Sequence, residues 1–247
     1  NQLVMKKSFL LLFIFACLGC NNAPATTSTT PAETAEAPVS GQIVGEDVPQ
    51  ERRDVLYYYR RLKEPYRSGY ELKENNGQWT SISPDTEEPI AAVVDLKNGF
   101  IEIVDQGTGG GEWTYRMALF RMADGQPVIG ITNTYFDGAG LEQQYYFLRP
   151  EDAQKLDWTK ETIREITGFD FLPLDNAEEE DIVKKLLPVS LELPRQGTSV
   201  KAVVYTGLEQ IYCRGDENEY SDYCVLFRQV QRNEIVLKWN KEKGKLE

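Results

Sequence analysis

The stretch EWTYRMALFRMADGQPVIGITNTYFDGAGLEQQYYFL, residues 112–148, decides the fold. It holds three runs rich in β-branched and aromatic residues, and short glycine-containing turns separate them. Connections this short join antiparallel strands. Because side chains alternate between the two faces of a strand, one wall of a core is expected on two of these runs. Its members are Trp113, Tyr115, Met117 and Leu119 on one run and Ile129, Ile131 and Tyr135 on the next.

Similar patterns extend the sheet in both directions along the chain. The predicted strands are 90–96, 99–105, 112–122, 127–136, 141–148, 189–193, 199–205, 224–230 and 234–239. Helices are predicted over 49–62, over 150–166 and from Asn176, where a capping box begins, to Pro188. This order predicts the α+β class, with antiparallel β-meander sheets and a few segregated helices.

A weak sequence similarity within the chain leaves open a division of the globular domain into two lobes, residues 49–167 and 176–247. The segment 101–108 resembles 191–198, and both lie where a strand enters a turn. Two hairpins that independently use similar turn residues explain the similarity equally well.

The glycine run 107–111 also follows a strand, but it lacks the spacing of a phosphate-binding loop, so it is interpreted as a hairpin turn.

The first part of the chain has the three-part layout of an export signal. Two lysines follow Met5, an apolar run covers 9–18, and Gly19 precedes Cys20. Residues 1–4 are expected to lie upstream of the true start, and the signal peptide is expected to end at residue 19. The apolar run is shorter than the about 20 residues that span a membrane.

The segment from Met5 to Asn22 resembles a bacterial lipoprotein signal. The resemblance implies that Cys20 carries acyl chains such as palmitate and becomes the first mature residue, with Cys17 as the competing site. Residues 20–48, dominated by Ala, Thr, Pro and Glu, predict a flexible linker between the lipid and a globular domain over 49–247. The expected location is the bacterial cell envelope, at the outer membrane or on the periplasmic face, rather than the cytoplasm.

Composition narrows the possible partners and chemistry. The formal charge is −12, and loss of the two leader lysines makes it −14. Such an acidic chain is not expected to bind nucleic acid, which requires clusters of Lys and Arg. The chain has no histidine, which removes the commonest general base and the usual zinc ligands. No cofactor and no metal are predicted.

Two cysteines remain after the leader is removed. In an oxidising compartment, Cys213 and Cys224 are predicted to form a disulfide. The acidic loop between them fails the EF-hand template, so a solvated loop is favoured over a calcium site. Its tripeptide 214–216 matches an adhesion motif, but three-residue matches arise easily by chance.

Tyrosine clusters supply the candidate binding surface. Sheet proteins use such residues mainly for packing. Tyr58 and Tyr146 are opposite in phase to their apolar neighbours, so these two are the candidates for exposed contact residues.

The leading hypothesis is a non-catalytic binding or structural domain that recognises an envelope protein, a glycan or another envelope component, with the membrane reached through the lipid anchor. The alternative is a carboxylate-dependent envelope hydrolase that acts on glycan or peptidoglycan. A cleft with two convergent acids would favour the enzyme.

Overall fold

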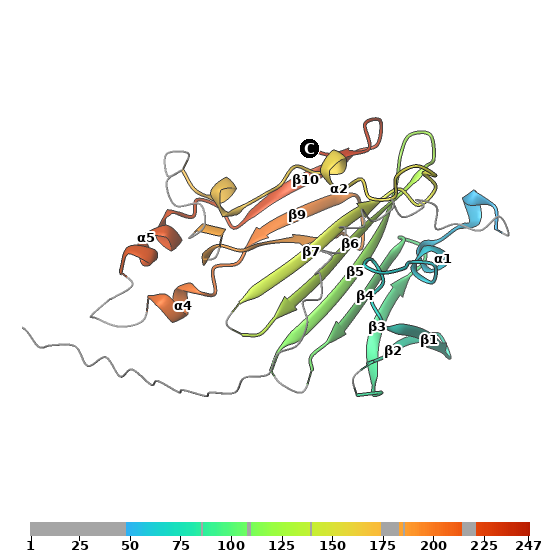
Figure 1. The fold of residues 1–247 in the computed structure, drawn as a ribbon, viewed down its shortest axis with the longest axis horizontal. Coiled ribbons are helices and arrows are strands. Elements are labelled where there is room, and N and C mark those ends of the chain that lie inside the picture. Colours follow the sequence, from blue (N-terminus) through green and yellow to red (C-terminus); the bar gives the residue numbers. More distant parts are fainter. Residues whose placement is uncertain are drawn as a thin grey trace, which may run out of the picture. The chain divides into compact units, whose positions relative to one another are not determined.

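Two antiparallel sheets form the body of the protein (Figure 1). The computed structural model describes residues 48–84, 86–107, 110–138, 140–173, 183–184, 186–213 and 221–247. The larger sheet has seven strands in sequence order: β1 (Glu71–Asn75), β2 (Gln78–Ile82), β3 (Pro89–Asp95), β4 (Phe100–Asp105), β5 (Glu112–Arg121), β6 (Pro127–Phe136) and β7 (Leu141–Leu148). The smaller sheet has the order β11 (Lys245–Leu246), β10 (Glu234–Asn240), β9 (Ser199–Val204), β8 (Val189–Glu192). The predicted α+β class with antiparallel meanders is confirmed.

The strands predicted from residues 112–148 are confirmed as β5, β6 and β7. Their register shows which residues of the predicted core wall lie opposite one another. Met117 lies opposite Ile131, and Leu119 lies opposite Ile129. Met117, Ile129 and Ile131 are buried, whereas Tyr135, near the end of β6, is 48% exposed. Alternation therefore fills the core along most of the strand and leaves its last residues at the surface.

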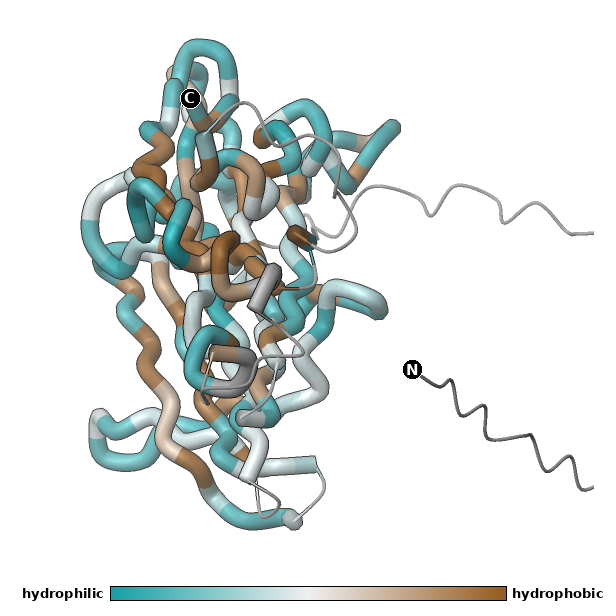
Figure 2. The backbone as a smooth tube through the Cα atoms, turned by 90° about the vertical axis from the view of Figure 1, so that its left-hand side faces the viewer, coloured by the Kyte–Doolittle hydropathy of each residue, from teal (hydrophilic) through white to brown (hydrophobic). Residues whose placement is uncertain are grey.

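Both faces of the larger sheet are covered. On one face the wall that includes Met117 packs against α1 (Val55–Tyr59). On the opposite face Phe120 and Phe147 pack with residues of the smaller sheet, among them Val200 and Ala202. Hydrophobic positions accordingly recur along the strands, while the turns are hydrophilic (Figure 2).

The hairpin of β1 and β2 was not predicted, because β1 has the polar sequence ELKEN. The turn supplies the missing signal. Asn75 pairs with Gln78, so only Asn76 and Gly77 connect the strands, and both have positive φ (53° and 78°). An Asn-Gly pair in this conformation is the strongest short hairpin signal.

Two of the predicted helices are much shorter than expected. The prediction over 49–62 is wrong in extent, since that region contains the 3₁₀ turn η1 (Gln50–Arg52) and α1, which the Asp54 carboxylate caps through the Tyr57 N–H at 2.8 Å. Within 150–166 only α2 (Thr159–Thr162) is helical, and η2 (Gly168–Phe171) follows. Residues before α2 instead pair with β7, as Asp157 does with Leu148.

The strand predicted over 224–230 is wrong. This region belongs to α5 (Ser221–Gln229), which follows α4 (Glu209–Tyr212). Cys224, Leu226 and Phe227 are buried while Val225 is 48% exposed, so the apolar residues form a helical stripe that resembles strand alternation over a few positions. The start of the helix predicted from Asn176 lies outside the described residues; residues 183, 184 and 186 are helical. No helix in the described ranges is both long and apolar enough to cross a membrane.

Candidate basic groove

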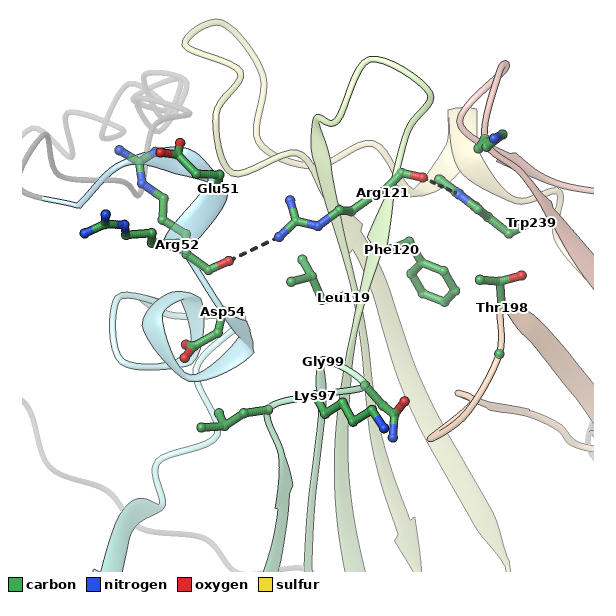
Figure 3. A pocket seen from close by; sticks show the side chains of 15 residues that line it. Glu51, Arg52, Asp54, Lys97, Gly99, Leu119, Phe120, Arg121, Thr198 and Trp239 are labelled. Atoms are coloured by element: carbon green, nitrogen blue, oxygen red, sulfur yellow. Dashed lines mark hydrogen bonds between the residues drawn. The ribbon is translucent and has the colours of Figure 1, made fainter.

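A groove of about 600 Å³ lies where the first described segment meets one end of the two sheets (Figure 3). Five chain segments line it: residues 51–54, the 96–99 turn, the end of β5 at 119–121, residues 197–198 before β9, and Trp239 with Lys241 at the end of β10. Because these segments span nearly 200 positions of the sequence, only the completed fold assembles the groove. We refer to it as the basic groove.

Its charge is opposite to that of the whole chain. Five cationic residues line it, against the two carboxylates of Glu51 and Asp54. The cationic residues are Arg52, Arg53, Lys97, Arg121 and Lys241. In a chain of formal charge −12, this is a local reversal of sign.

Most of these cations lack a carboxylate partner. Among the described residues, the side chains of Arg52, Lys97 and Lys241 form no ion pair. Within the same part of the chain, the hydrogen bonds that the Arg121 guanidinium donates go to backbone carbonyls, that of Gly125 at 3.3 Å and that of Arg53 at 3.4 Å. Arg52, Lys97 and Lys241 are therefore available to an anion. Arg121 also has donors that a stronger acceptor than a backbone carbonyl could recruit.

One wall of the groove is fixed by a nearly buried ion pair. Arg53 donates from Nη1 to Glu151 Oε1 at 2.9 Å and from Nε to the Val48 carbonyl at 2.7 Å. The two charged side chains are only 11% and 14% exposed. Since Arg121 also donates to the Arg53 carbonyl, residues 51–54 are attached both to the loop after β7 and to the end of β5.

The opposite wall is aromatic. The Trp239 ring lies 5.2 Å from that of Phe120, and its Nε1–H donates to the Arg121 carbonyl at 2.9 Å. Figure 3 shows Arg121 extending from β5 toward the Glu51–Asp54 wall, with Trp239 on its other side. The groove thus combines cationic side chains with a flat apolar surface.

The Lys97 turn is held by its own hydrogen bonds. The Asp95 carboxylate accepts from the backbone N–H of Asn98 at 3.1 Å and from its side-chain amide at 2.9 Å. The Arg195 Nε also donates to it at 3.1 Å. These bonds, first that of the Asn98 side chain, then that of Arg195 and then that of the Asn98 backbone, hold the pKa of Asp95 below its ordinary value. Lys97 is therefore presented from an ordered turn.

The groove offers binding groups and few groups for chemistry. Asp54 already accepts a hydrogen bond as the cap of α1, which leaves Glu51 as the other lining carboxylate. Within the described ranges no group of three or more Cys, Asp or Glu residues could hold a metal ion. The arrangement suits an anionic ligand.

The predicted site residues are distributed differently. Cys20 lies outside the described residues, as does the acidic loop 214–220 with its tripeptide. The predicted disulfide is confirmed: it joins Cys213, after α4, to Cys224 in α5, with a Cα–Cα distance of 5.6 Å. The strands on either side of the glycine run 107–111, β4 and β5, pair antiparallel, and residues 108 and 109 of that run lie outside the described residues.

The expectation that Tyr58 is exposed is wrong, because its side chain is fully buried. The α1 helix is only five residues long, and all five residues are buried between neighbouring elements. No side of the helix therefore faces solvent. The Tyr58 hydroxyl donates to Glu151 Oε1 at 3.0 Å. Burial first, and then this hydrogen bond, raise the pKa of Tyr58 above its ordinary value.

Tyr146 is half-buried, and its ring meets that of Tyr66 edge-on at 5.0 Å. It lines a second groove, of about 580 Å³, between β7 and the segment around α2. Sequence reasoning placed neither groove. The paired Arg52 and Arg53 and the Lys97-Asn98-Gly99 turn were visible signals, but nothing local connects them to Arg121, Trp239 or Lys241.

No known protein family and no curated protein sequence matches this chain. Among solved structures, it is similar to a domain of an uncharacterized protein from Porphyromonas gingivalis W83. The two share 12% sequence identity and a TM-score of 0.45, over 72% of this chain and 78% of that chain.

Proposed function

We propose that this protein is a lipid-anchored binding protein of the bacterial cell envelope, whose non-catalytic domain holds an anionic glycan in the basic groove. One observation carries the proposal: cations from separate segments, three of them without a carboxylate partner among the described residues, line one groove of an acidic chain. An acidic surface repels polyanions elsewhere, so the groove concentrates attraction at one place.

Carboxylate- or phosphate-bearing sugars match both parts of this groove. Their charged groups pair with Arg and Lys, and the apolar face of a sugar ring packs on an aromatic side chain such as Trp239. Nucleic acid is disfavoured, because a duplex extends well beyond a groove of this size and would meet the acidic remainder of the surface.

The anchor follows from the resemblance of the leader to lipoprotein signals. Two or three acyl chains on Cys20 would hold the chain firmly, since each buried methylene contributes about 0.8 kcal/mol. A flexible linker of the length of 20–48 has a root-mean-square reach of about 30 Å. The domain would therefore sample glycan close to the membrane surface.

Binding is tested by titrating the purified chain with polygalacturonate, with uncharged dextran as the control polymer. We expect polygalacturonate to bind, and its affinity to fall as salt is raised. Lys97→Glu and Lys241→Glu should each weaken binding about fivefold. The matched control is Lys73→Glu, because Lys73 is an exposed lysine of β1 outside the groove. Equal loss in all three variants, or equal binding of dextran, would contradict the groove.

Attachment is tested separately by growing cells in labelled palmitate. We expect label on the wild-type chain and none on Cys20→Ala, which should move from the membrane to the soluble fraction. An unlabelled wild-type chain would refute the anchor and leave the groove experiment unaffected.

A further inference from the structure

The free edge of β7 has an unoccupied stretch of backbone. β7 is the last strand of the larger sheet and pairs with β6 on its inner side. On its outer side, Arg149 N–H donates to the Leu156 carbonyl at 2.9 Å, and Trp158 N–H donates to the Phe147 carbonyl at 2.8 Å. Phe147 N–H donates to Thr159 Oγ1 at 2.9 Å. The chain's own segment 156–159 therefore covers the end of this edge.

The backbone groups of Phe147 and Arg149 point away from β6. Because backbone direction alternates along a strand, those of Tyr145 and Gln143 point the same way. Among the described residues, neither the N–H nor the carbonyl of Tyr145 bonds to a group outside the β6–β7 pair. Pairing at the edge thus stops where segment 156–159 turns into α2.

This open stretch faces the second groove. Residues 143–146 form one side, and Thr159, Lys160, Ile163, Arg164 and Glu165 form the other. Ile163 has extended backbone angles (φ −140°, ψ 138°), so the far wall leaves α2 as an open chain. The groove follows the edge for four residues, about 13 Å at 3.3 Å per residue.

We propose that this edge accepts a short extended peptide segment of a partner protein as an eighth strand. Alternating N–H and carbonyl groups are complementary to another extended backbone, and native edges of this kind are normally covered or blocked. A sugar or a lipid headgroup has no matching repeat of donors and acceptors. The inference depends neither on the basic groove nor on the anchor.

Charge on the far wall selects among peptides. Lys160 is exposed and forms no ion pair among the described residues, whereas Arg164 pairs with Asp170 at 2.7 Å. An acidic side chain in the peptide would meet Lys160, and a basic side chain would meet the exposed Glu165, which lines the same wall. The Tyr146 ring, beside the edge, offers an apolar contact to an alternate side chain.

The experiment screens a randomised library of eight-residue peptides against the purified chain. Sequences with an acidic residue should be enriched, and a synthetic copy should slow hydrogen exchange of the Tyr145 amide at least tenfold. The Tyr146 amide faces β6 and should be protected with and without peptide. Two methylated versions of the peptide, one at the odd and one at the even backbone nitrogens, lose backbone donors and keep all side chains. Only alternate nitrogens of an added strand face β7, so one version should bind more than tenfold more weakly and the other should not.

Two variants separate backbone from side chain. Tyr145→Ala keeps the outward N–H, and Tyr145→Pro removes it at an edge position where proline is tolerated. We expect binding to survive in the first and fail in the second. Equal binding by both, binding without Tyr145 protection, an already protected Tyr145 amide in the free protein, or no enriched peptide would each overturn the inference. The exchange measurement on the wild-type chain decides the matter if the proline variant does not fold.

Discussion

The side-chain amide of Gln143 takes the place of a neighbouring strand for Leu191. Its oxygen accepts from the Leu191 N–H at 2.6 Å, and its nitrogen donates to the Leu191 carbonyl at 3.1 Å. Gln143 belongs to β7 and Leu191 to β8, each the edge strand of its own sheet. One amide therefore links the edges of the two sheets.

Gln143→Leu should lower the free energy of unfolding by about 2–3 kcal/mol, because it leaves the Leu191 backbone groups without their partners. Urea unfolding followed by circular dichroism measures the change. The matched control is Gln144→Leu, since the exposed Gln144 side chain forms a single hydrogen bond within the described part of the chain, from the Tyr146 hydroxyl at 3.4 Å. Equal losses in the two variants would show that the link does not stabilise the fold.

Tyr58 should make stability fall at alkaline pH. Its folded pKa is raised, first by burial and then by the hydrogen bond to Glu151. The stability that a neutral Tyr58 contributes is fully present below the unfolded pKa of about 10, and it is lost as pH rises above that value toward the higher folded pKa. One such group contributes a slope of at most about 1.4 kcal/mol per pH unit.

Tyr58→Phe should therefore unfold more easily at pH 8, by about 1.5 kcal/mol, and lose stability less steeply above pH 10. Unfolding free energies measured from pH 8 to pH 11.5 provide the comparison. Tyr135→Phe is the control, because that side chain is 48% exposed and should leave both quantities unchanged. A Tyr58→Phe slope as steep as that of the wild type would contradict the assignment.

The larger sheet could be predicted because its signals are local. β5, β6 and β7 each have the pattern of one strand, and short turns fix their order. The Asn76-Gly77 turn was an equally local signal, but the polar β1 concealed it. Segment 224–230 has a pattern that suits helix and strand alike, and as the helix α5 it buries Leu226 and Phe227 in the core cluster that the smaller sheet also enters.

Burial in α1 and the composition of both grooves depend on contacts distant in sequence. Tyr58 is buried in a cluster with residues distant in sequence, such as Met117, and its hydroxyl donates to Glu151, 93 positions away. Arg121 and Trp239 meet only because β5 and β10 end at the same place. Single-sequence patterns contain no information on such pairs, so the tyrosine phase was a poor guide to exposure.

The Cys213–Cys224 disulfide should stabilise the connection between α4 and α5. It closes a loop with a sequence separation of 11, for which loop-closure entropy gives about 3 kcal/mol. A Cys213→Ser, Cys224→Ser double variant should lose that amount in urea unfolding. Reducing the wild-type chain with dithiothreitol should produce the same loss and leave the double variant unchanged. A further loss on reduction of the variant would assign the effect to other thiols.

A side chain at Gly99 should destabilise the fold, for two reasons that can be separated. Its φ is +67°, and an added Cβ would lie 3.0 Å from the Leu119 Cβ. The positive φ alone costs about 1 kcal/mol, and the contact with the strand that lines the basic groove adds to it, so Gly99→Ala should cost about 2–3 kcal/mol. Gly125→Ala is the matched control, because its φ is +86° and no atom lies within 4 Å. It should lose only the backbone contribution of about 1 kcal/mol. Thermal unfolding compares the two variants. Equal losses would mean that Leu119 moves to accommodate the added methyl group. The turn beside Lys97 would then be less constrained than its geometry indicates.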